Sequence, residues 1–179
     1  MPAKALGAFL ALFAASAACA QSAFPETDPC SLVSDAELAQ RVGAPRTRLV
    51  SDFDGNTKVA FCVLRVDVTT GSPPQAMTFF VQMTFFLGLD RTRALEVYRS
   101  GERGSAPLAD VGEAAHIAVG AGPGATKNVT FIDAIRGRHL LAVLAGYDVD
   151  DDATRPPLDE ASRQAAVAIA KDYLARWPD

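Results

Sequence analysis

The stretch 58–87, KVAFCVLRVDVTTGSPPQAMTFFVQMTFFL, contains two runs in which every second residue is apolar. Successive side chains of a β-strand point to opposite faces, so this alternation predicts two strands that each turn one face toward a core. The intervening Gly71-Ser72-Pro73-Pro74 turns the chain back and makes the two strands an antiparallel hairpin. The predicted core-facing residues are Ala60, Cys62, Leu64, Val66 and Val68 on the first strand, and Met77, Phe79, Val81, Met83, Phe85 and Leu87 on the second.

The opposite face of this hairpin also carries large apolar side chains, namely Phe61, Val63, Phe80 and Phe86. Two interpretations remain open. In the first, helices pack on these residues as a second core layer; in the second, the residues form an exposed patch that binds a partner or an apolar ligand. We take these four residues as the candidate ligand or partner face.

The rest of the chain predicts further strands and three helices. Ser34 and Glu37 form a capping box for a helix that ends at Gly43. Helices are also expected over 90–100 and 158–177, and strands over 46–51, 114–119, 128–136 and 139–146. The resulting order is α–βββ–α–βββ–α. Runs of hairpin-linked strands between helices predict an α+β fold, an antiparallel sheet with helices packed on one face.

Residues 1–20 have the pattern of an export leader. Lys4 provides the positive start, 5–15 are apolar, and Ala18-Cys19-Ala20 is a signal-peptidase site that leaves Gln21 first. The apolar run is too short to be a membrane span. We therefore expect a periplasmic or secreted protein. In the alternative, Ser16-Ala17-Ala18-Cys19 is a lipobox and Cys19 carries a lipid anchor, which is the one expected route to a membrane.

The remainder divides into a polar, flexible lead-in over 21–29 and a single α+β domain over 30–179. The formal net charge of −4 speaks against a general affinity for nucleic acid or for anionic membranes.

Three cysteines occur in the chain, and two of them, Cys30 and Cys62, lie beyond the leader. In an exported domain such a pair predicts a disulfide, while two buried free thiols are the alternative. A disulfide would also remove both residues as nucleophiles or metal ligands.

Signs of catalysis are weak. His116 and His139 are the only histidines, and both are expected on strand surfaces. Neither a G-x-S-x-G nor an H-E-x-x-H motif is present. The positive charge of Arg136 and Arg138 beside His139 could meet an anion. We expect no enzymatic activity and no cofactor.

The strongest metal candidate is the acidic loop over 148–159. Asp148, Asp150, Asp152 and Asp159 occupy positions 1, 3, 5 and 12 of a calcium loop. However, Ala153 replaces the glycine that such a loop needs at position 6, and two prolines stiffen the middle. A solvated loop is the preferred interpretation, so no metal is expected.

Three short motifs resemble those of small exported bacterial proteins of unknown function, best known among actinobacterial lipoproteins. They are DPCSLVSDAEL over 28–38, Phe61-Cys62, and LADVGEA over 108–114. That family typically reads "PC-x-L-hydrophobic-[ST]-x-x-E", a second cysteine in a strand beside an aromatic residue, and "glGdeA". Its usual Cys-x-Trp is Cys62-Val63-Leu64 here. The resemblance implies an exported domain related to the PsbP-like sandwich, and it implies no chemistry.

Together these features predict an exported, non-catalytic domain that binds an envelope protein or a small apolar ligand. The alternative is a metal- or anion-dependent periplasmic enzyme that uses the 148–159 acidic loop, or His139 with Arg136 and Arg138.

Overall fold

The computed structural model describes residues 28–44, 48–52, 58–70, 74–101, 105–120, 128–150 and 154–178. Several sequence predictions lie outside these residues. They are the leader over 1–20 with Cys19, most of the lead-in, the turn residues Gly71, Ser72 and Pro73, and the metal candidate Asp152.

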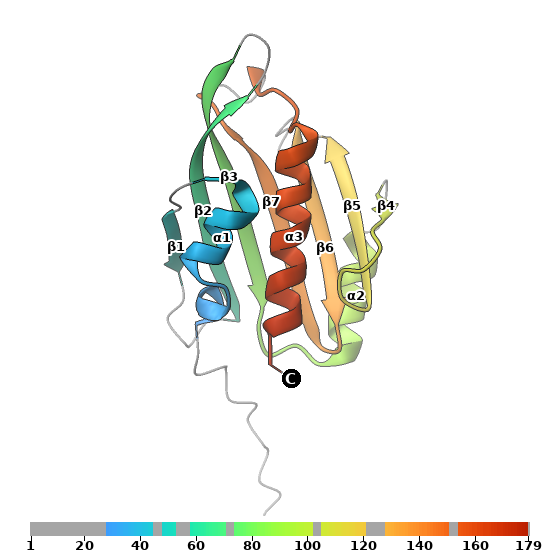
Figure 1. Ribbon diagram of the computed structural model, residues 1–179. Coiled ribbons are helices and arrows are strands. Elements are labelled where there is room, and N and C mark those ends of the chain that lie inside the picture. Colours follow the sequence, from blue (N-terminus) through green and yellow to red (C-terminus); the bar gives the residue numbers. More distant parts are fainter. Residues whose placement is uncertain are drawn as a thin grey trace, which may run out of the picture.

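The centre of the molecule is one seven-stranded antiparallel sheet with the strand order β1-β2-β3-β7-β6-β5-β4 (Figure 1). This confirms the predicted α+β fold, and the short strand β4 is an addition to the predicted order. The strands are β1 Arg48–Asp52, β2 Val59–Thr70, β3 Gln75–Phe86, β4 Ala106–Pro107, β5 Ala114–Gly120, β6 Val129–Arg136 and β7 His139–Asp148.

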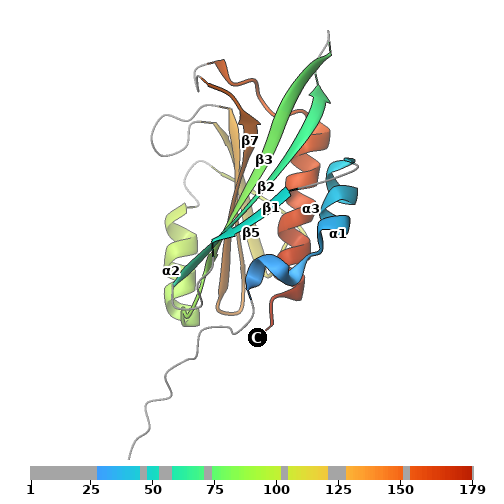
Figure 2. The same cartoon turned by 90° about the vertical axis from the view of Figure 1, so that its left-hand side faces the viewer.

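The helices lie on both faces of the sheet. The 3-10 turn η1 (Pro29–Leu32), α1 (Asp35–Val42) and α3 (Glu160–Arg176) lie on one face, and α2 (Arg91–Gly101) lies on the other (Figure 2). The prediction of helices on one face therefore holds for α1 and α3 but not for α2. The cause is that Phe86, Ile135 and Leu140 form an apolar surface on the second face, and α2 packs on it through Ala94 and Tyr98.

The first helix forms as its capping residues predict. The backbone N–H of Glu37 donates to Ser34 Oγ over 3.4 Å, and the backbone N–H of Ser34 donates to Glu37 Oε2 over 3.0 Å. Gly43 ends α1 in the left-handed conformation, with φ of 66°. That conformation suits glycine because it has no Cβ. Both ends of α1 are therefore specified locally.

The main core lies between the sheet and α3. The predicted inner face of the hairpin is confirmed, since Cys62, Leu64 and Met83 are fully buried. The ring of Phe85 makes edge-on contacts with the rings of Tyr173, at 5.5 Å, and Trp177, at 5.0 Å. Helix α3 contributes five buried residues to this core: Ala166, Ile169, Ala170, Tyr173 and Leu174.

The predicted disulfide between Cys30 and Cys62 is confirmed. Their Cα atoms are 5.6 Å apart, and both residues are buried. The Tyr173 hydroxyl donates a 3.0 Å hydrogen bond to the carbonyl oxygen of Cys30. The start of the described chain is thus fixed both to β2 and to α3, and α1 follows directly from this fixed point.

Candidate functional site

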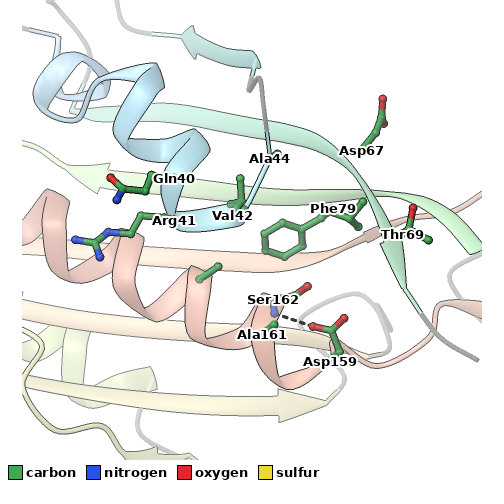
Figure 3. A pocket seen from close by; sticks show the side chains of 13 residues that line it. Gln40, Arg41, Val42, Ala44, Asp67, Thr69, Phe79, Asp159, Ala161 and Ser162 are labelled. Atoms are coloured by element: carbon green, nitrogen blue, oxygen red, sulfur yellow. Dashed lines mark hydrogen bonds between the residues drawn. The ribbon is translucent and has the colours of Figure 1, made fainter. Parts of the chain in front are cut away.

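A groove of about 450 Å³ opens where the C-terminal end of α1 meets the N-terminal half of α3 above the β2–β3 hairpin (Figure 3). Its apolar lining consists of Val42, Gly43, Ala44, Val68, Phe79, Ala161 and Ala165. The polar residues that line it are Gln40, Arg41, Asp67, Thr69, Asp159 and Ser162.

The floor of the groove is aromatic. Phe79 from β3 is only 1% exposed, and its ring makes an edge-on contact with Tyr147 of β7 at 6.1 Å. The side chains of Ala161 and Ala165 on α3 are too small to fill the space above this floor. The volume falls within the range of about 300–1,000 Å³ that is typical of small-molecule sites.

A fixed set of polar groups borders the groove at the start of α3. Asp159 caps the helix, since its Oδ1 accepts a 2.7 Å hydrogen bond from the backbone N–H of Ser162. The Tyr147 hydroxyl donates to Asp159 Oδ2 over 3.1 Å and lies 3.1 Å from Ser162 Oγ. These contacts orient both Asp159 oxygens before any ligand arrives.

Two ion pairs join α1 to α3, and Arg41 of one of them lines the groove. Arg41 binds Asp172 through Nε and Nη2, at 2.7 and 3.0 Å, and Arg176 Nη1 donates to Glu37 over 2.9 Å. The hydrogen bond to Asp172 raises the pKa of Arg41, and the hydrogen bond from Arg176 holds the pKa of Glu37 far below its usual range. Solvent exposure weakens such pairs.

The four residues of the predicted ligand face differ in burial. Phe86 packs in the α2 cluster, and Phe80 is 9% exposed. A Cβ at Gly146 would lie 3.0 Å from the Phe80 ring, so this ring occupies the space that the glycine leaves open. Phe61 remains 38% exposed and Val63 is half-buried.

Both histidines are buried, so their expected placement on strand surfaces is wrong. His116 is 4% exposed, and its Nε2 lies 2.9 Å from Asp133 Oδ2. Tyr98 of α2 covers it, with ring centroids 4.9 Å apart. His139 is 6% exposed and stacks on Trp177 at 4.6 Å. Alternation alone missed this because both faces of these strands are covered.

The residues of the alternative anion site do not converge. Arg136 donates hydrogen bonds to the carbonyl oxygens of Ala175, at 2.8 Å, and Trp177. Its guanidinium therefore satisfies the C-terminal end of α3. Arg138 is exposed, whereas His139 is covered by Trp177.

The three candidate metal-loop carboxylates that the structure describes lie in separate environments. Asp148 pairs with Arg65 at 3.0 Å, Asp159 caps α3, and Asp150 is exposed. In the described ranges, the one close group of three potential metal ligands is Asp28, Cys30 and Cys62. Both cysteines of that group are in the disulfide.

No protein-family model, curated protein or solved structure matches the chain. Over the described residues, no helix combines the length and apolar character that crossing a membrane requires.

Proposed function

We propose that the protein is an exported, non-catalytic domain that binds a small, largely apolar molecule in the groove between α1 and α3. The observation that carries this proposal is the groove above Phe79, bounded by the alanines of α3. The groove is open to solvent, so a bound apolar molecule would gain free energy by removing its own apolar surface and that of the groove from water.

The expected affinity is moderate. If a ligand buries about 200 Å² of apolar surface, the hydrophobic contribution is about 5 kcal/mol before the entropic cost of association. The groove is also partly open, so solvent reaches one side of the ligand. A dissociation constant in the micromolar range or weaker follows, which suits a carrier or sensor that releases its ligand.

Binding without turnover is the better interpretation of the residues present. Ser162 is the one hydroxyl at the α3 border of the groove, and neither of the two buried histidines is among the described residues that line it. A serine nucleophile requires a base within hydrogen-bond reach. The leader-like start of the sequence and the disulfide support an exported location.

The proposal is tested with a neutral apolar dye, N-phenyl-1-naphthylamine, whose fluorescence rises in apolar surroundings. Ala161→Trp should fill the groove and lower the affinity at least tenfold. Ala175→Trp, at another exposed position of α3, is the matched control and should bind like the native protein. Phe61→Ser tests the second face and should also leave binding unchanged.

Native-like binding by Ala161→Trp would refute the groove as the site. Loss of binding in Phe61→Ser, with the fold intact by circular dichroism, would move the site to the second face of the sheet.

A further inference from the structure

We infer that the outer edge of β1 binds a second copy of this chain, so that two sheets join into one through antiparallel pairing of β1 with β1. This inference does not depend on the groove. Three observations carry it: the contrast between the two edges of the sheet, the exposed apolar residues beside β1, and the order of charges along this strand.

The two edges of the sheet differ in how well they resist the addition of another strand. One edge is β4, which has only two residues and includes Pro107. Short edge strands and prolines both oppose further pairing. The other edge is β1, which pairs with β2 over five residues in one continuous register and has the proline-free sequence RLVSD. Figure 2 looks onto this edge. β1 is therefore the edge that suits a further strand.

Large apolar side chains lie exposed beside this edge. Val50, the central residue of β1, is 44% exposed, and Phe61 of β2 is 38% exposed. Both lie on the same face of the sheet, since Val50 is opposite Val63, two residues along the strand from Phe61. A strand that pairs with β1 and places an apolar residue opposite Val50 would remove part of this surface from water.

The sequence of β1 selects a second copy as the partner. Two identical strands pair antiparallel about a two-fold axis, and only an axis at Val50 pairs all five residues of β1. This register puts Val50 opposite Val50 of the second copy, and position 48 of each copy opposite position 52 of the other. The sequence has arginine at 48 and aspartate at 52, and opposite charges directly across two strands are favourable. Within one copy the register partner of Arg48 is Arg65, so a carboxylate on its other side adds to the gain.

The resulting interface is small, so the dimer should form reversibly. A stable interface buries at least about 1,000 Å², which one pair of short strands does not reach. We therefore expect a dissociation constant of about 10–100 µM.

Sedimentation velocity of the native protein between about 5 and about 500 µM measures this equilibrium. The weight-average sedimentation coefficient should rise from that of a monomer toward that of a dimer. Val50→Lys places two like charges at the axis and should keep the protein monomeric over the whole range. Val119→Lys is the matched control, because Val119 is also an exposed valine, at 58%, but lies in β5. It should dimerise like the native protein.

A charge swap tests the register. Asp52→Arg and Arg48→Asp each place like charges opposite one another when the variant pairs with itself, so each alone should dimerise about tenfold more weakly. An equal mixture of the two variants presents opposite charges at both ends of the paired strands. It should associate with nearly native affinity. Circular dichroism of each variant checks that the fold is intact.

A native protein that stays monomeric throughout this range would overturn the proposal and leave the edge of β1 to a strand of a different protein. Dimerisation that survives Val50→Lys would also overturn it, because the interface would then lie elsewhere. A mixture of the charge variants that associates no better than either variant alone would refute the pairing about Val50.

Discussion

Gly112 should tolerate no side chain, and the reason lies in both its backbone and its surroundings. Its φ is +61°, in the left-handed region that costs an L-residue about 1–2 kcal/mol. A Cβ at this position would lie 2.5 Å from the carbonyl oxygen of Ile135 and 2.5 Å from Leu174 Cδ2. The Ile135 oxygen already accepts a 2.8 Å hydrogen bond from the backbone N–H of Glu113, so it cannot easily move away.

The magnitude follows from these two effects. Forcing an extra carbon into a packed site typically costs about 1–3 kcal/mol. With the backbone strain, Gly112→Ala should destabilise the protein by about 2–5 kcal/mol. Gly137→Ala is the matched control, because its φ is +59° and a Cβ there would meet nothing within 4 Å. The unfolding free energy of Gly137→Ala should fall only by the cost of the backbone strain, about 1–2 kcal/mol.

Urea unfolding followed by the fluorescence of Trp177 measures both variants. Trp177 is buried beside Phe85 and is the single tryptophan of the chain, so its signal reports the main core. The expected result is a larger fall in the unfolding free energy for Gly112→Ala than for Gly137→Ala. Equal losses would refute the steric argument and leave backbone strain as the whole effect.

Two further predictions concern stability. Replacing Cys30 and Cys62 together with alanine should lower the unfolding free energy by about 3–4 kcal/mol, because the disulfide closes a long loop in the unfolded chain; a loss below about 1 kcal/mol in urea unfolding would contradict this. Burial raises the pKa of the Asp133 carboxyl, so the folded protein binds a proton at this group more tightly than the unfolded chain does. The stability that protonated Asp133 provides is therefore lost as the pH rises through this raised pKa. Asp133→Asn should therefore be more stable than the native protein at pH 7, and the difference should shrink as pH falls toward 4; a difference that grows on acidification in urea unfolding would contradict the sign.

The hairpin and the disulfide could be predicted from the sequence because their signals are local. Alternation assigned Cys62 and Leu64 to the core, and the capping residues placed α1 within a residue of its ends. The pairing of Cys30 with Cys62 required only an even pair of cysteines beyond a leader. These signals depend on neighbouring residues, and tertiary packing did not alter them.

The position of α2 could not be predicted in the same way. Its support on the sheet comes from Phe86 in β3 together with Ile135 in β6 and Leu140 in β7, which are far apart in the sequence. Strands that are apolar on both faces show that two layers are possible, but not which helix covers which face. The same ambiguity explains the wrong exposure expected for His116, since α2 covers it.

The groove could not be predicted from the sequence, and the reason differs from that for α2. Its space results from residues that are small, such as Ala161 and Ala165, and small residues leave no periodic signal. Its floor residue, Phe79, was correctly assigned to the core, and nothing in the alternation of β3 distinguishes it from Phe85. The difference is that α3 covers Phe85 with Tyr173, whereas alanines lie above Phe79.

The disulfide links this groove to the stability of the whole molecule. Helix α1 has only eight residues, which is too short to be stable alone, yet it forms one wall of the groove. It is held by the disulfide just before it and by its ion pairs to Asp172 and Arg176 on α3. Exposed ion pairs contribute little, so the covalent link and the buried Leu38 carry most of this attachment. Loss of the disulfide should therefore weaken ligand binding even under conditions in which the sheet remains folded.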